Sequence, residues 1–461
     1  MLKKIVKISW MALVSTIVLF NLSACQSVVL KSPTELIKPP KLDVDQEEVR
    51  QVIEEVLPDK TQLTSIVQKT DVGAINFIDL DGDEVDEAVA FYKSQEKDYL
   101  SGVIILKYGE SGWEKFDEKK EIANDIESVS FEDVTQDGNK DILVGYIGDK
   151  DFDKYLVIYS IDKDEKIIRV FEKSYNELAI ADFDYDDQIE IILFQLDRNV
   201  SAQAQLYESR NDKFFILDEY EINEYVSAYD NVVVGDLYKD DIGMVVDFRV
   251  GAKAAASIML KVEHDRIVNV LDGENEKYYY EAKYKPYFIE SDDIDNDGII
   301  EIGNIIEPIG YEDISNLNTP YIEEWSVWDG DRKLKLDRQS YSNSKYRFRF
   351  LFPEKWNNQI TVEKRDLADV EDSIIFSYLT EDGKEILPIY SIQVYSNEKW
   401  LLIEPLMKEK SKVYKVIGKN ANYTYIICEE NYAIDSQEYK QRFNDMKIND
   451  SEMKDKFYFI K

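Results

Sequence analysis

The sequence DIDNDGIIEIGNI, residues 293–305, places three aspartates on alternate positions, follows them with a glycine and continues as an apolar run. Numbered from Asp293, acidic residues occupy positions 1, 3, 5 and 9, and glycine occupies position 6. Alternate carboxylates in a tight loop, with one backbone carbonyl at position 7, supply the oxygen ligands that Ca²⁺ prefers. Glycine at position 6 permits the positive φ that such a loop needs. The stretch therefore predicts a calcium loop that joins two strands.

The same arrangement recurs five times along the chain. The copies begin at Asp79, Asp133, Asp182, Asp236 and Asp293, and each has an apolar run on both sides of its acidic turn. Two further strand-like runs separate successive copies, and four short strands per period of about 50 residues are typical of a β-propeller blade. A lone blade cannot bury both faces of its sheet, so the copies are expected to pack in a ring. The predicted fold is mainly β, with a propeller of about five four-stranded blades, or six if an additional element joins the edge.

Four copies carry a full set of candidate calcium ligands at positions 1, 3, 5, 7 and 9. In chain order these are Asp79, Asp81, Asp83, Val85 and Glu87; Asp133, Thr135, Asp137, Asn139 and Asp141; Asp182, Asp184, Asp186, Gln188 and Glu190; and Asp293, Asp295, Asp297, Ile299 and Glu301.

Two departures from this pattern affect individual copies. The fourth copy keeps only Asp236 and Asp240, with Tyr238 at position 3 and Met244 at position 9, and is expected to bind no metal. The first and third copies lack the glycine at position 6, where Glu84 and Asp187 stand. The alternative for all copies is a hydrogen-bonded Asx-type turn without metal.

A helix–loop–helix calcium site is excluded by the residues at position 12. Such a site needs glutamate there, and the four copies have Ala90, Val144, Leu193 and Asn304 instead. An acidic residue at position 9 together with β-type flanks resembles the FG-GAP/VCBS repeat family, whose propeller blades carry a DxDxDG calcium loop between their first two strands. The resemblance covers residues 70–342 and implies calcium with a structural role.

The first 25 residues have the order of a secretory leader. A basic start, MLKKIVK, precedes the apolar run ISWMALVSTIVLF, and the sequence LSAC ends at Cys25. LSAC resembles the lipobox of bacterial lipoproteins, which implies removal of residues 1–24 and lipidation of Cys25. The expected location is the extracytoplasmic face of the cell membrane, held by acyl chains. Residues 25–44 are predicted to be a tether, and residues 45–69 a short helical segment that leads into the repeats.

The C-terminal residues 343–461 have a different pattern, with alternating strands and a helix candidate near the end. They are predicted to form an α+β domain on an antiparallel sheet. The motif YRFRFLFPEKW, residues 346–356, weakly resembles the start of PsbP/Mog1-like domains, a generally non-catalytic family. An unrelated α+β domain is the alternative.

The composition narrows the range of functions. The formal net charge of −37 argues against nucleic acid as a partner and disfavours broad contact with anionic lipid. No nucleophile elbow, phosphate loop or zinc motif is present in the sequence. We therefore expect a binding or scaffolding module for a protein or glycan at the cell envelope. The alternatives are a hydrolase of envelope polysaccharide or peptidoglycan, with carboxylates at the channel mouth, and a spacer without ligand.

Overall fold

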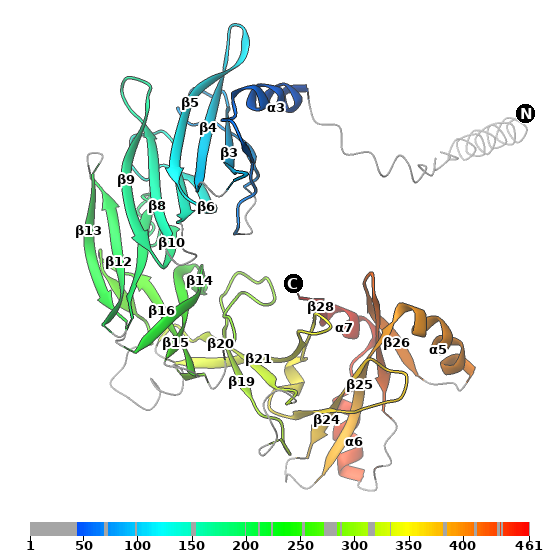
Figure 1. Ribbon diagram of the computed structural model, residues 1–461. Coiled ribbons are helices and arrows are strands. Elements are labelled where there is room, and N and C mark those ends of the chain that lie inside the picture. Colours follow the sequence, from blue (N-terminus) through cyan, green and yellow to red (C-terminus); the bar gives the residue numbers. More distant parts are fainter. Residues whose placement is uncertain are drawn as a thin grey trace, which may run out of the picture.

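The computed structural model shows a chain built mainly of β-strands (Figure 1). It describes residues 44–68, 72–96, 99–148, 154–198, 200–210, 213–222, 225–250, 254–271, 284–285, 288–311, 319–331, 333–380, 385–409, 413–430, 434 and 437–460. The predicted leader, the Cys25 lipidation site and nearly all of the tether lie outside these residues. Within the described residues, no helix is both long and apolar enough to cross a bilayer.

The described strands form six antiparallel sheets, of which five follow the repeats in the sequence. Sheet 1 contains β1 (Thr61–Leu63), β2 (Ile75–Ile78), β3 (Glu87–Ser94), β4 (Leu100–Gly109) and β5 (Gly112–Ile122). Sheet 2 contains β6 (Asp125–Glu132), β7 (Asp141–Ile147), β8 (Lys154–Ile161) and β9 (Ile167–Tyr175). Sheet 3 contains β10 (Glu177–Ala181), β11 (Glu190–Asp197), β12 (Ser201–Ser209) and β13 (Phe214–Glu221). Sheet 4 contains β14 (Val226–Tyr238), β15 (Asp241–Val250), β16 (Ala254–Val262), β17 (Ile267–Asn269) and β18 (Tyr284–Lys285).

Sheet 5 extends beyond the predicted end of the repeats. It contains β19 (Ile302–Ile306), β20 (Ile322–Trp328), β21 (Leu334–Asn343), β22 (Phe348–Leu351) and the C-terminal strand β28 (Phe457–Phe459). The predicted boundary between residues 342 and 343 thus falls inside one sheet, since β21 pairs with β22 and β22 pairs with β28. The reason is the apolar alternation of β22, which buries Phe348 and Phe350 in the core of the C-terminal region.

Residues of the middle strands are buried on both faces, which explains their continuous apolar runs. In β11, Ile191 and Leu193 pack toward sheet 2, whereas Ile192 and Phe194 pack toward sheet 4. Each sheet is thereby covered by its neighbours in the sequence, as expected of an array of repeats. The core is a series of layers between sheets.

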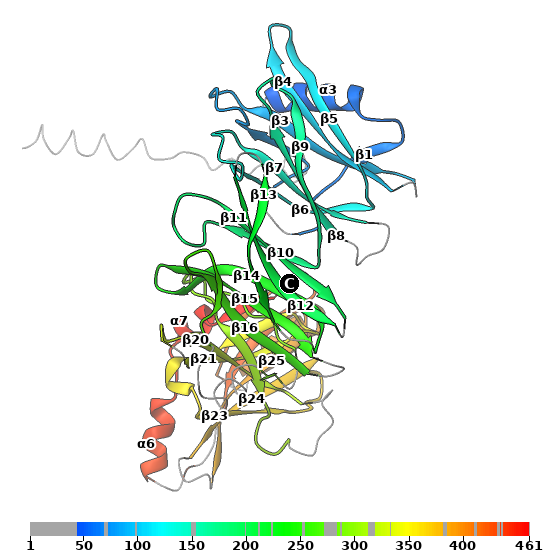
Figure 2. The same cartoon turned by 90° about the vertical axis from the view of Figure 1, so that its left-hand side faces the viewer.

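The predicted ring is not closed in this structure, because both ends of the array are covered by other elements. Helix α3 (Val44–Val56) lies where the sequence predicted a short helix, and its Val49 and Ile53 are fully buried against the outer face of sheet 1. At the other end, Ile322 and Tyr341 of sheet 5 belong to the core of the C-terminal region. Figures 1 and 2 show the sheets following one another along an open arc between these two ends.

The C-terminal region places helices beside a five-stranded sheet. The strand order is β23–β24–β25–β27–β26, and Trp356 lies fully buried in its aromatic core. The bounds are η2 (Glu354–Trp356), β23 (Ile360–Lys364), β24 (Asp372–Leu379), β25 (Ile386–Ser396), α5 (Asn397–Glu409), β26 (Tyr414–Lys419), β27 (Tyr423–Glu429), α6 (Gln437–Asp445) and α7 (Asp450–Asp455).

Candidate metal loops

Four of the five acidic turns have one common backbone conformation. We name them loop 1 (residues 79–87), loop 2 (133–141), loop 3 (182–190) and loop 5 (293–301), and the fourth copy turn 4 (236–244). Position 4 has φ between 60° and 75° in all four loops, and position 6 has φ between 66° and 93°. Glu84 and Asp187 therefore adopt the left-handed conformation that Gly138 and Gly298 adopt in the other two loops. Lack of glycine does not change the loop, although a non-glycine residue costs about 1–2 kcal/mol there.

The register of the sheets holds each loop closed. The residue at position 9 pairs with the residue directly before position 1, as in Ile78 with Glu87 and Ala181 with Glu190. In loop 5 the flanking first strand is reduced to a single bridge between Asp292 and Glu301. The position-9 carboxylate also accepts a hydrogen bond from the position-2 N–H in every loop, at 2.9–3.0 Å.

The remaining acidic side chains organise the loop backbone. In loop 5 the Asp293 carboxylate accepts hydrogen bonds from the N–H groups of Asp297 (3.1 Å) and Gly298 (2.9 Å). The Asp297 carboxylate accepts one from Ile299 N–H at 2.9 Å. Loops 2 and 3 repeat these hydrogen bonds at the same positions. Loop 1 has one difference: the N–H group that donates to the first oxygen of Asp79 belongs to Gly82 at position 4, not to the residue at position 5. The carboxylates at positions 1, 5 and 9 thus shape the turn in all four loops.

Three of the loops bring carboxylates together closely enough to hold a metal ion. In each cluster one oxygen from every member lies within 4.8 Å of the others. The clusters are Asp79, Asp81 and Glu87; Asp182, Asp184 and Glu190; and Asp293, Asp295 and Asp297. The predicted ligands at positions 1 and 3 therefore meet in all three loops, joined by position 9 in loops 1 and 3 and by position 5 in loop 5.

Several carboxylate oxygens of the loops are buried and have no hydrogen-bond partner within the described structure. Oδ1 of the position-3 residue is buried and accepts no hydrogen bond within the described structure in loops 1, 3 and 5, where it belongs to Asp81, Asp184 and Asp295. Oε1 of Glu301, a residue with 0% exposure, is likewise buried and accepts no hydrogen bond within the described structure. A buried charged oxygen without compensation is costly, and a cation shared by the cluster would compensate it.

Burial and repulsion between neighbouring charges raise the pKa of some of the loop carboxyls. Burial, with added repulsion from neighbouring aspartates, raises the pKa of Glu190 to about 7 and that of Glu301 to about 8. The pKa of Asp184 is also raised, by burial first and then by the charges of Asp186 and Asp182. A bound divalent cation would favour the ionised forms and lower these pKa values again.

Two loops have a basic counter-charge that the sequence pattern did not reveal. Lys107 on β4 forms ion pairs with Asp81 and, at 3.6 Å, with Glu87. Arg338 on β21 pairs with Asp295. Both residues come from strands beyond the motif, so only the sheet register brings them to the loop. Loop 3 has no ion pair to Asp184 or Glu190 among the residues that the structure describes, and its negative charge is the least compensated.

Loop 2 and turn 4 differ from these three. In loop 2, Thr135 replaces the position-3 aspartate, and its hydroxyl donates to Asp141 at 3.3 Å. Burial raises the pKa of Asp141 to about 6. In turn 4 the strands β14 and β15 stay paired up to Tyr238 and Asp241, so a tight hairpin replaces the open loop.

Hydrogen bonds join each acidic turn to the next along one edge of the array. They run from Lys140 N–H to the Leu80 carbonyl (2.9 Å), from the Gln136 amide to Gln188, from the Tyr185 hydroxyl to the Asp240 carbonyl (2.7 Å), and from Ile300 N–H to the Asp236 carbonyl (2.9 Å). The turns are therefore contacts between neighbouring sheets as well as connections within a sheet. Ordering one loop would support the adjacent sheet.

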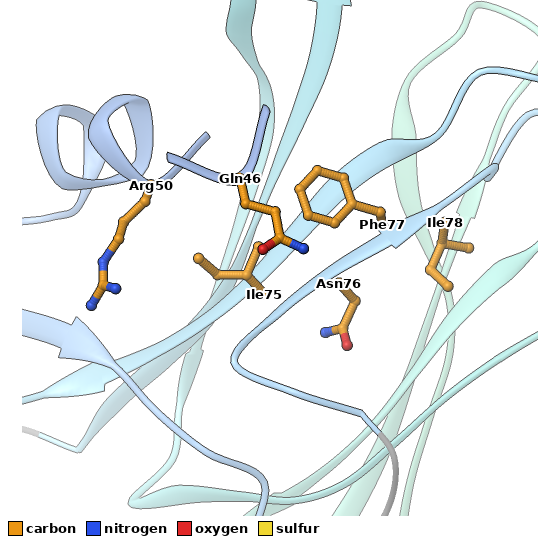
Figure 3. Close-up of a pocket in the computed structure, with 6 residues that line it drawn as sticks. All are labelled: Gln46, Arg50, Ile75, Asn76, Phe77 and Ile78. Carbon is orange, nitrogen blue, oxygen red and sulfur yellow. The ribbon is translucent and has the colours of Figure 1, made fainter. Parts of the chain in front are cut away.

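Two cavities are lined by residues outside the acidic loops themselves. One of about 390 Å³ is formed where Gln46 and Arg50 of α3 face Ile75 and Phe77 of β2 (Figure 3). The described residues that line it include no carboxylate. A polar cavity of about 240 Å³ at the junction of sheet 5 and the C-terminal region contains a single one, from Asp372. A pair of carboxylates, as used in glycoside hydrolysis, does not occur among the described residues that line either cavity.

Comparisons with known proteins assign no family to the chain. No protein-family model and no curated protein sequence matches it. Among solved structures, it is similar to a protein from Bacteroides fragilis provisionally assigned as a 6-phosphogluconolactonase, with 8% sequence identity and a TM-score of 0.29. The match covers 70% of this chain and 85% of that one. A TM-score of 0.29 is too low to assign a fold or an activity.

Proposed function

We propose that this protein is a lipid-anchored cell-envelope module that binds or scaffolds a protein or glycan through propeller-type blades stabilised by calcium. The anchor is the part predicted from the LSAC sequence at Cys25. The calcium is supported by one observation above all: buried, unpaired carboxylate oxygens recur at position 3 of loops 1, 3 and 5.

Calcium fits these loops better than a transition metal does. The donors are carboxylates and backbone carbonyls, which are hard oxygen ligands, and the clusters contain no histidine or cysteine. The carbonyls of Val85, Gln188 and Ile299, at position 7, would complete the oxygen set. Extracellular calcium modules bind in the range of about 10⁻⁴–10⁻³ M, so occupancy would follow the calcium of the medium.

Binding without catalysis is favoured by what surrounds the loops. Their carboxylates take part in backbone hydrogen bonds and in the clusters, where a bound cation would keep them ionised. The hydrogen bonds between successive turns would let calcium fix the arrangement of the sheets, and hence the surface presented by the arc. A scaffold needs such a fixed surface.

A pull-down from envelope extract with the full-length protein, in calcium and in chelator, tests the proposal. A specific partner retained in calcium and lost in chelator is the expected result. The double variant Asp184→Asn/Asp295→Asn should lose the partner in calcium too, whereas Asp236→Asn in turn 4 should retain it. Turnover of envelope polysaccharide or peptidoglycan by the purified protein, with no retained partner, would favour the hydrolase instead.

A further inference from the structure

In each sheet with an acidic loop, the strand that follows the loop pairs with a further strand, which places one residue beside position 9. In sheet 1 the register of β3 and β4 puts Lys107 there. In sheet 3 the register of β11 and β12 puts Glu208 there. The same place holds Ser160 in sheet 2 and Val327 in sheet 5. Residues that face each other in an antiparallel pair lie on the same side of the sheet, so this residue sets the charge next to the loop.

Two of the loops have a basic side chain against the position-3 carboxylate. The Lys107 ammonium pairs with Oδ2 of Asp81, and the Arg338 guanidinium, which comes from β21, pairs with Oδ2 of Asp295. The other oxygen of each aspartate, Oδ1, is buried and has no hydrogen-bond partner within the described structure. The two basic side chains are only 24% and 19% exposed, so salt screens their charges less than those of surface residues.

Loop 3 has the opposite charge at this place. Glu208 is 18% exposed there, and its carboxylate pairs with Arg210, a side chain that is 57% exposed. Among the residues that the structure describes, no basic side chain pairs with Asp184. Burial raises the pKa of Asp184 and of Asp295, and the charge of Arg338 opposes the rise at Asp295. Loop 3 is therefore the cluster whose negative charge is least compensated.

We propose that Lys107 and Arg338 are internal counter-cations that set the order of calcium binding, so that loop 3 fills first and loops 1 and 5 fill at about tenfold higher calcium. The inference rests on the calcium sites of the proposed function. In the empty loop, the basic group offsets the repulsion between the carboxylates. The same charge repels an incoming cation, since a unit positive charge about 5 Å from a divalent ion weakens its binding about tenfold even at the dielectric constant of water.

Loop 3 would then be the loop whose shape depends most on the calcium of the medium. It lies in the middle of the array and is hydrogen-bonded on both sides. Gln188 of loop 3 accepts from the amide of Gln136 in loop 2. The Tyr185 hydroxyl donates to the Asp240 carbonyl of turn 4 at 2.7 Å. Calcium in loop 3 would therefore fix sheets 2, 3 and 4 relative to one another, whereas the basic residues hold loops 1 and 5 without metal.

Equilibrium dialysis of the full-length protein in detergent, against radioactive calcium, measures the order of binding. The wild type should bind one calcium ion about tenfold more tightly than the next, and Asp184→Asn should remove that tight site. Lys107→Met and Arg338→Met should each tighten one further site about tenfold, whereas the charge-preserving controls Lys107→Arg and Arg338→Lys should not. Glu208→Lys, which places a basic group beside position 9 of loop 3, should weaken the tight site about tenfold.

Thermal melting of the same variants gives a second measurement. Lys107→Met should lower the Tm in chelator, because the repulsion in loop 1 is no longer offset, and calcium should restore it. A Tm loss that calcium does not reverse would overturn the proposal, because Lys107 would then only support the fold. Weaker calcium binding by Lys107→Met would overturn it as well, since Lys107 would then position Asp81 for the metal. Equal affinities at all sites, unchanged in the variants, would overturn the order of binding and leave the calcium sites of the proposed function intact; a wild type that binds no calcium would refute both.

Discussion

Asp184→Asn in loop 3 should raise stability in chelator and abolish the stabilisation that calcium provides through this loop. Asp184 lies in a cluster whose carboxylate oxygens are within 4.8 Å of one another, and no ion pair to it occurs within the described residues. Two unit charges at that distance repel by about 1 kcal/mol even at the dielectric constant of water, and by about 3 kcal/mol at an effective value near 20. Removal of one charge should therefore stabilise the chelated protein by about 1 kcal/mol or more.

Calcium should reduce this difference in stability between the variant and the wild type. A site filled at about ten times its Kd contributes about 1.4 kcal/mol to the folded state. Since 1 kcal/mol moves the Tm of a domain of this size by about 2–4 °C, the variant should lose about 3–6 °C of the calcium-induced shift. In chelator its Tm should instead lie about 2–4 °C above that of the wild type.

Differential scanning calorimetry of both proteins, in chelator and in calcium, measures all four values. Asp236→Asn is the matched control, because turn 4 keeps the aspartate at position 1 and forms no carboxylate cluster among the described residues. A change in Tm that is equal in sign and size with and without calcium would refute the reasoning, because it would mean that Asp184 only shapes a hydrogen-bonded turn.

Three further predictions concern pH, backbone conformation and the covered end of the array. The pKa values of Glu190 and Glu301 are raised from 4.5 to about 7 and about 8. The chelated protein should therefore lose stability as the pH rises from 4.5 through these values, and calcium should restore that stability. Thermal melting at several pH values checks this. Glu84→Gly should stabilise the protein by about 0.5–1 kcal/mol, since glycine adopts the left-handed conformation freely. Gly298→Ala should destabilise it by about 1–2 kcal/mol, although a Cβ at this position meets no atom within 4 Å. Denaturant titration measures both changes. Ile53→Ala should destabilise sheet 1 by about 2–5 kcal/mol, with hydrogen exchange increasing there before it does in sheet 4.

The repeats made the sheets predictable because each acidic turn marks the connection between two apolar strands. The turn positions alone located β2–β3, β6–β7, β10–β11 and β14–β15, and they also gave the clusters at positions 1 and 3. The register that makes Glu87 and Glu190 close their loops follows from the same nine-residue spacing.

What the sequence did not reveal depends on contacts between distant residues. The burial of both sheet faces suggested a ring, but Val49 and Ile53 of α3 cover one end of the array equally well. Lys107 and Arg338 reach their loops from later strands, so no local motif records them. Glycine at position 6 proved a poor guide to the loop conformation, since Glu84 and Asp187 adopt the same backbone conformation there. The threonine at position 3 of loop 2 matters more, because Thr135 removes a carboxylate from that loop.

The central claim, that the acidic loops are cation sites, is tested most directly by anomalous diffraction from crystals of this protein soaked in a lanthanide such as terbium, which substitutes for calcium. Anomalous peaks should lie between Asp182, Asp184 and Glu190 in loop 3, and at the corresponding points of loops 1 and 5. Crystals that show well-ordered loops and no anomalous density at these carboxylates under saturating cation would contradict the account.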